Sequence, residues 1–224
     1  MEVVNAQHLP FELTKEFLEE IRSFIESGSK EEIIAKIEDL FPADITSILY
    51  ELNGVESKYL VQLLETKVAA EIISALDSDD RIKFLKNFTS QEIAIYINEI
   101  DSDDAVDILN EQPVRIREEV IALIKDRVQA RYFIDLMHYD EDCAGGLMQK
   151  ELIKINVKQT VTECVEEIRR QAEEVEKVYS VYVVDDDGLL LGTVSLKKII
   201  LAKRGSKIQD VFDSDEIVSV PTYM

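Results

Sequence analysis

A twelve-residue repeat dominates the first half of the chain and constrains its fold more than any other feature. Residues 41–112 divide into six consecutive units in which the eighth and ninth positions are always apolar. The twelfth position is apolar in five of the six units, Gln112 being the exception. Several units open with a polar or turn-forming pair that is typical of a helix N-cap, so each unit predicts a two-turn helix followed by a short turn. The units read FPADITSILYEL, NGVESKYLVQLL, ETKVAAEIISAL, DSDDRIKFLKNF, TSQEIAIYINEI and DSDDAVDILNEQ.

Helices of this length do not persist alone in water, but stacked units bury a continuous apolar seam. The flanking residues predict further helices over 14–26 and 31–40 before the repeat, and one longer helical stretch over 114–135 after it. We therefore expect residues 1–138 to form an all-α helical-repeat superhelix.

The pattern changes at Tyr139. The adjacent Gly145 and Gly146 stop a helix, and the residues that follow alternate between strand-like and helix-like segments in the order β-α-β-β-α. An acidic-Gly turn at residues 186–188 predicts a hairpin. Residues 139–215 are therefore expected to form a small α/β domain, which makes the chain multidomain, α plus α/β. The expected strands cover 152–155, 178–185, 189–194 and 217–220, and the expected helices cover 160–173 and 195–203.

The chain is strongly acidic. It holds 25 Lys and Arg against 46 Asp and Glu, a formal net charge of −21, and residues 1–138 alone hold 29 acids and 14 bases. Such a surface repels phosphate backbones and anionic lipids, which argues against nucleic-acid binding. A solubilising surface and a cation-binding surface both agree with this charge, and composition leaves the two interpretations open.

Other functional classes lack a matching sequence pattern. The longest apolar runs are five residues, whereas a membrane-spanning helix needs about 20, and residues 1–10 carry no secretory signal. The two cysteines, Cys143 and Cys164, cannot form a metal cage and suit a reducing, cytosolic compartment. No phosphate-binding loop, nucleophile elbow or zinc-protease motif occurs, so we assign no catalytic residue and do not expect an enzyme.

The second half resembles a cystathionine-β-synthase-type (CBS) regulatory domain. The resemblance lies in residues 181–200, which read as a strand, an acidic-Gly hairpin, a Gly-containing strand and a Ser-capped helix. With the acidic repeat containing FPADI and DSDDAVDIL, and the junction YDEDCAGGLM, essentially the whole chain resembles the cytosolic part of the MgtE family of magnesium transporters. In that family a second CBS unit, a connecting helix and a transmembrane pore follow.

The resemblance implies both a location and a function. It implies that residues 216–224 begin a truncated second CBS domain and that the chain works at the cytoplasmic face of the cell membrane. Because CBS units normally pair, dimerisation or a missing C-terminal half is expected. In such transporters the acidic helical domain and the CBS pair close around Mg²⁺ when cytosolic magnesium is plentiful, which shuts the pore, because bound divalent cations turn the repulsion of apposed carboxylates into attraction.

Five residues are candidate Mg²⁺ contacts. Asp103 and Asp107 are four residues apart and share a helix face, where like charges repel without a counter-ion. Asp103 and Asp104 also suit a first helical turn, whose dipole favours acids, so a purely structural role explains these two but not Asp107. Glu71 occupies the same seventh position of its unit as Asp107. The resemblance implies metal contact for these acids, and for the backbone carbonyl of Gly146, which is equally well explained as a helix stop.

Two alternative functions remain open. CBS units often bind adenine nucleotides through a motif that ends in an Asp for the ribose hydroxyls, but here Lys198 stands at that position and cannot accept hydrogen bonds. This substitution weakens the interpretation as a nucleotide sensor. A helical adaptor without any ligand is excluded only by the family resemblance.

Overall fold

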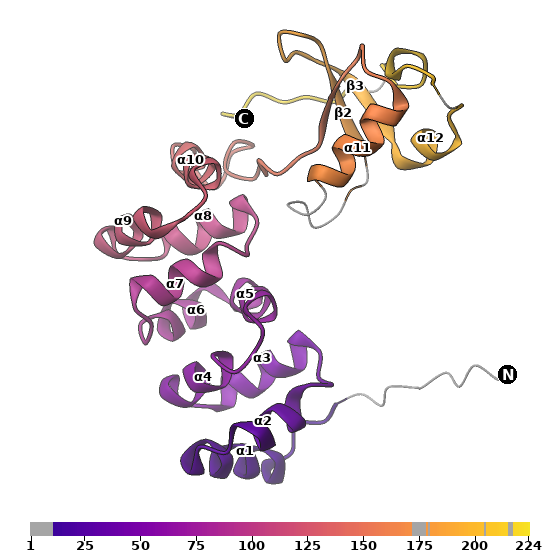
Figure 1. The fold of residues 1–224 in the computed structure, drawn as a ribbon. Coiled ribbons are helices and arrows are strands. Elements are labelled where there is room, and N and C mark those ends of the chain that lie inside the picture. The colour runs from indigo at the N-terminus through magenta and orange to yellow at the C-terminus, as the bar shows by residue number, and fades with distance from the viewer. Residues whose placement is uncertain (1–10, 172–177, 179, 204, 215–216) are drawn as a thin grey trace, which may run out of the picture. The chain divides into compact units, whose positions relative to one another are not determined.

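The computed structural model describes residues 11–171, 178, 180–203, 205–214 and 217–224 (Figure 1). The chain divides into two compact units, Met1–Met137 and His138–Met224. The described part of the first unit is entirely helical, and the second unit combines a three-stranded sheet with short helices. The predicted fold class, α plus α/β, is confirmed.

The helices of the first unit follow one another with short turns between them (Figure 1). Their bounds are α1 Lys15–Ser27, α2 Lys30–Ile37, α3 Pro42–Glu51, α4 Gly54–Val61, α5 Thr66–Ala75, α6 Ser78–Leu85, α7 Ser90–Ile97, α8 Ser102–Asn110, α9 Val114–Leu123 and α10 Arg127–Leu136.

Each of the six repeat units forms one helix, as the repeat predicts, and this helix begins at the second residue of the unit. The first residue is the N-cap. In α4 and α7 the cap is a complete capping box: the side chains of Asn53 and Thr89 accept from backbone N–H groups, and Glu56 and Glu92 reach back to the cap residues. In these two units the side chain of the cap residue therefore helps to set where the helix begins.

The apolar positions of the repeat form the core of this unit. The eighth and ninth residues of every unit are buried. Gln112, the polar exception at the twelfth position, is buried too, and its side-chain amide donates to the Ile108 carbonyl at 3.3 Å. A hydrogen bond thus allows this polar side chain to replace an apolar one in the seam.

Much of the packing in the first unit joins helices that are two apart along the chain. Helix α3 contacts α5, α5 contacts α7 and α7 contacts α9, while α4 contacts α6 and α8 contacts α10. This alternation builds the superhelix expected from the repeat. No helix among the described residues is both long and apolar enough to cross a membrane.

The prediction of one long helix over residues 114–135 is wrong. The structure has two helices there, and the backbone is extended at Ile124, where φ is −61° and ψ is 122°. Asp126 then caps α10 by accepting from the Val128 N–H at 2.7 Å. The sequence predicts a single helix because apolar residues continue at helical spacing across the break. This spacing outweighs the N-cap signal of Asp126.

The second unit has the expected β-α-β-β-α order. Strand β2 pairs in parallel with β1 and antiparallel with β3, so the sheet order is β1-β2-β3. The hairpin between β2 and β3 contains Gly188 at φ 81°, and the Asp185 carboxylate accepts from two backbone N–H groups of the turn, those of Asp187 and Leu189. The bounds are β1 Lys154–Asn156, α11 Val161–Gln171, β2 Ser180–Val184, β3 Leu190–Ser195, α12 Leu196–Leu201 and a 3-10 helix Ile208–Asp210.

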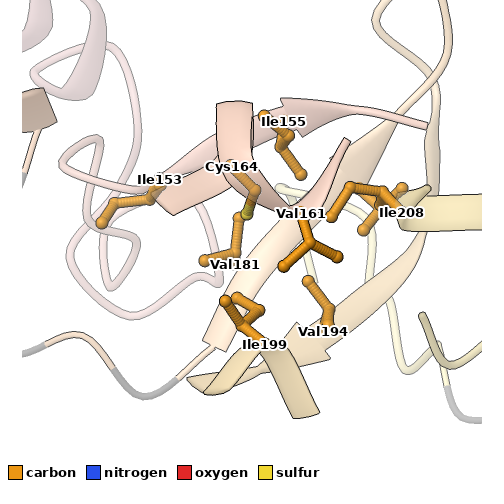
Figure 2. Packing of buried hydrophobic residues seen from close by; sticks show 9 residues of the cluster. Ile153, Ile155, Val161, Cys164, Val181, Val194, Ile199 and Ile208 are labelled. Carbon is orange, nitrogen blue, oxygen red and sulfur yellow. The ribbon is translucent and has the colours of Figure 1, made fainter. Parts of the chain in front are cut away.

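This unit has its own apolar core, shown in Figure 2. Val161 and Cys164 of α11 pack against sheet residues that include Val181 and Val194, and Ile199 of α12 joins the same cluster. The core is therefore formed by side chains from the strands and from both helices.

One predicted strand of this unit is not formed, and parts of two other predicted elements lie outside the described residues. The expected strand over 217–220 is wrong: residues 217–224 lie in no strand, and Val218 is 90% exposed. Instead, the carbonyls of Thr222 and Met224 accept from the N–H groups of Gly145 and Ala144, each at 2.7 Å. The predicted helix 160–173 ends with residues 172 and 173, and the predicted strand 178–185 includes residue 179; these three residues lie outside the described residues, as do residues 215 and 216.

Candidate functional site

The acidic residues of α8 recur along one face of the helix. Asp103 and Asp104 lie in its first turn, Asp107 lies one turn further, and Glu111 is the C-cap. Spacings of three and four residues place Asp104, Asp107 and Glu111 on the same side of the helix. Ser102, Ala105, Val106, Ile108 and Leu109 form its buried side.

Helix α5 contacts α8 and adds a second line of polar residues. The Ser74 hydroxyl of α5 donates to Asp104 Oδ2 at 2.9 Å. Glu71 precedes Ser74 by one helical turn, so the two residues share a face of α5, and Glu71 is exposed. Glu71 therefore shares a face of α5 with Ser74, which contacts Asp104 of α8, and its metal contact remains a prediction.

A basic side chain from α6 lies against the same face. Arg81 donates through Nε and Nη2 to the two carboxylate oxygens of Glu111, at 2.9 and 2.6 Å. Its Nη1 donates to the carbonyls of Ser74 and Leu76 at the end of α5, at 2.7 and 3.0 Å. The side chains of Arg81 and Glu111 are only 11% and 14% exposed. This bidentate ion pair thus joins the ends of α5 and α8 to α6.

The charges of this region interact. The hydrogen bonds to Glu111 raise the pKa of the Arg81 guanidinium above its usual value, against the opposing cost of burial. The negative charges of Asp104 and Asp107 raise that pKa further. We call this region the α5–α8 seam, and it consists of Glu71, Ser74, Arg81, Asp104, Asp107 and Glu111.

Asp103 has a different environment. Its Oδ1 is buried and has no hydrogen-bond partner among the residues that the structure describes. A buried anionic oxygen without a donor is unfavourable, so a cation or water beside it would be stabilising. The acidic side chains of α8 offer only oxygen atoms as metal ligands, which suits a hard cation such as Mg²⁺. This ion keeps several waters and needs only one or two carboxylates. Among the residues that the structure describes, no three His, Cys, Asp or Glu side chains gather as a metal cage.

Gly146 lies in the turn that follows Asp140. A Cβ at this position would lie 2.4 Å from the Asp140 carbonyl oxygen, and the Gly146 N–H donates to the Cys143 carbonyl at 3.0 Å. The close approach of the backbone explains why glycine is needed here. Metal contact by the Gly146 carbonyl remains a prediction.

Three members of the seam were not among the predicted site residues: Ser74, Arg81 and Glu111. Their contacts join residues 30 positions apart, namely Ser74 with Asp104 and Arg81 with Glu111. A sequence signal did exist, because the fourth and sixth repeat units both open with DSDD and differ at the fifth position, Arg81 against Ala105.

The candidate nucleotide-binding position of the second unit is engaged by a neighbouring acid. Lys198 Nζ contacts the Asp213 carboxylate. The backbone of Asp213 also pairs with that of Thr193 in both directions, at 3.0 and 2.8 Å. Lys198 therefore has an anionic partner within the unit.

Comparison with known families divides the chain into two parts. Residues 40–142 match the family described as "MgtE intracellular N domain", and residues 144–205 match the CBS domain family. The magnesium transporter MgtE of Thermus thermophilus is 28% identical over 197 residues, which are 86% of this chain and 43% of the relative. The MgtE of Enterococcus faecalis is 34% identical over 86 residues, 38% of this chain and 19% of that protein. The chain thus spans less than half the length of these relatives.

Solved structures give the same result for the fold. The cytosolic domain of the Mg²⁺ channel MgtE, crystallised in complex with ATP, has a TM-score of 0.83 and 27% identity, with 92% of this chain and 84% of that chain covered. The soluble part of a magnesium transporter has a TM-score of 0.76 at 24% identity, over 91% and 80% of the two chains. With a match to the MgtE intracellular N domain followed by a match to the CBS domain, the chain is similar to the cytosolic part of MgtE magnesium transporters.

Proposed function

We propose that this chain is a cytosolic Mg²⁺-sensing region that gates a magnesium transporter or channel. The observation that carries the proposal is the likeness of 92% of the chain to the cytosolic domain of a Mg²⁺ channel, together with the matching order of the two domains. The proposal includes no enzymatic activity.

The α5–α8 seam supplies a physical basis for sensing. Asp104 and Asp107 on α8 and Glu71 on α5 place negative charge on adjoining helices. Carboxylates of like charge repel, and a divalent cation between them or opposite them changes the sign of the interaction. Mg²⁺ would be held by one or two of these carboxylates and by waters, with Asp103 as a further oxygen donor.

The proposal also names partners and a location. A second CBS unit and a transmembrane pore would complete the transporter, and CBS pairing would give a homodimer. The chain would then lie at the cytoplasmic face of the membrane. Binding of Mg²⁺ would stabilise the closed arrangement of these parts, because a ligand favours the state that binds it better.

Thermal unfolding tests the sensing proposal directly. Ionic screening depends only on ionic strength, whereas site binding adds a stabilisation of RT ln(1 + [L]/Kd), about 2.7 kcal/mol at one hundred times Kd. We expect MgCl₂ to raise the melting temperature clearly more than NaCl of equal ionic strength. Equal shifts in the two salts would contradict a magnesium site in this chain.

Adenine-nucleotide binding is the second candidate, favoured by the ATP complex of the related cytosolic domain. Lys198 at the motif position, already in contact with Asp213, argues against it, because a lysine cannot accept from ribose hydroxyls. Stabilisation by ATP in the presence of EDTA would support the nucleotide function. A chain that responds to neither ligand would be a helical adaptor.

A further inference from the structure

The last described residues of the chain bind the segment with which the second unit begins. We call residues 139–147 the junction, because they lead from α10 of the first unit to β1 of the second. We call residues 221–224 the strap. Two backbone hydrogen bonds of 2.7 Å join these segments, from the Gly145 N–H to the Thr222 carbonyl and from the Ala144 N–H to the Met224 carbonyl. Segments far apart in the sequence are thus paired through their main chains.

The strap is itself a closed turn. The Met224 N–H donates to the Pro221 carbonyl at 3.1 Å, which is the hydrogen bond between the first and fourth residues of a β-turn. The side chains of Tyr223 and Met224 are 82% and 69% exposed. The strap therefore holds the junction with main-chain carbonyls, while these two side chains face solvent.

Gly145 fits closely between the strap and an aromatic ring. It is buried, and a Cβ at this position would lie 2.4 Å from Cδ1 of Tyr139 and 3.0 Å from the Thr222 carbonyl oxygen. Gly145 does not have a positive φ, so close approach explains why glycine is needed here. A buried N–H that loses its acceptor is unfavourable, so release of the strap would open this part of the junction to water.

We propose that the strap is a conformational device that holds the link between the two units in one conformation when bound and frees it when released. The hydrogen bonds from the Gly146 and Leu147 N–H groups to the Cys143 carbonyl, at 3.0 and 3.2 Å, close a turn within the junction. The strap ties that turn to a distant part of the chain. A partner that engages residues 221–224 would therefore change the mobility of the link. This inference goes beyond the proposed function and does not depend on Mg²⁺.

Amide hydrogen exchange and ¹⁵N relaxation of the chain in EDTA test the proposal. Deletion of residues 222–224 removes both acceptors, so the amides of Ala144 and Gly145 should exchange about tenfold faster or more. The order parameters of the junction should fall from about 0.85, the value of rigid backbone, to below about 0.6. Exchange at Val183, a buried residue of β2, should stay unchanged, which shows that the unit remains folded.

Val218→Ala is the matched control for the deletion. Its side chain is 90% exposed and belongs to the same terminal segment, so neither the exchange rates nor the order parameters should change. Gly145→Ala approaches the contact from the other side, because its Cβ would displace the Thr222 carbonyl and leave the strap sequence intact. This variant should give the same faster exchange and greater mobility as the deletion.

Each outcome decides. Unchanged exchange at Ala144 and Gly145 in the deletion variant would overturn the proposal, and so would faster exchange with unchanged order parameters, because the bonds would then form without controlling the junction. If Gly145→Ala does not fold, the deletion and its control still decide. All measurements are made without Mg²⁺, so failure of this inference and failure of the magnesium-sensing function remain distinguishable.

Discussion

At the scale of single residues, Asp107 distinguishes two interpretations. A solvated surface acid and a metal ligand at this position should respond differently to substitution. Asp107→Asn keeps the side-chain shape and removes the charge. Without Mg²⁺ the change should be small, within about 0.5 kcal/mol, because lost repulsion from Asp103 and lost attraction to Arg81 oppose each other. With Mg²⁺ it should reduce the stabilisation by about 1 kcal/mol, since an amide oxygen replaces an anionic ligand poorly. Thermal melts in EDTA and in excess MgCl₂ measure both quantities.

The matched control for this substitution is Glu118→Gln. Glu118 is an exposed acid on α9, so its replacement removes the same charge away from the seam. It should change the melting temperature equally with and without Mg²⁺. If Asp107→Asn behaves like this control, Asp107 is not a ligand in this chain.

The roles of single residues were predictable only where they depend on local spacing. The acids of α8 could be found because residues three and four apart share a face. Arg81 could not be assigned, because its partners Glu111 and Ser74 come into contact only through the packing of α5, α6 and α8.

At the scale of elements, Glu92 joins two helices and caps one of them. It accepts from the Thr89 N–H at 2.7 Å, from Lys58 Nζ at 2.8 Å and from Gln62 Nε2 at 2.8 Å. The hydrogen bond from Lys58, and after it those from Thr89, hold the pKa of Glu92 below its usual range. Such a carboxyl contributes stability above its unfolded pKa, about 4.3, which is lost as the pH falls through the folded value.

Glu92→Gln should therefore lower the free energy of unfolding at pH 7 by about 1–2 kcal/mol, through the lost ion pair and the weakened cap. The difference in the free energy of unfolding between variant and parent should become smaller as the pH falls from 5 to below 4, because the parent loses the same charge there. Urea unfolding at several pH values measures this gap. Glu99→Gln, at an exposed position beyond α7, is the control, and a gap for Glu92→Gln that does not change with pH would contradict the role of its charge.

The elements themselves differed in how far sequence could predict them. The six repeat helices were predicted one per unit, because each unit carries two adjacent apolar positions and several units open with a cap signal. The break at residues 124–126 was missed, since a single cap at Asp126 competes with continuous apolar spacing. The prediction of a strand at 217–220 is wrong because a strand forms only with a pairing partner. The local pattern of Val and Ile does not indicate whether such a partner is present.

At the scale of the whole molecule, the two units have separate cores and unequal charge. Residues 1–138 hold a net charge of −15 from 29 acids and 14 bases. The relatives that match parts of this chain are named magnesium transporters, and the α5–α8 seam lies in the more acidic unit. The central claim is that Mg²⁺, and not ionic strength, changes the state of this chain.

Small-angle X-ray scattering of the parent chain tests that claim most directly. The radius of gyration is measured in EDTA, in millimolar MgCl₂ and in NaCl of equal ionic strength, with Asp107→Asn measured in parallel. Because bound divalent cations turn repulsion between acidic surfaces into attraction, we predict that MgCl₂ makes the chain more compact than NaCl does, and that Asp107→Asn reduces this difference. The same radius of gyration in both salts would contradict the account.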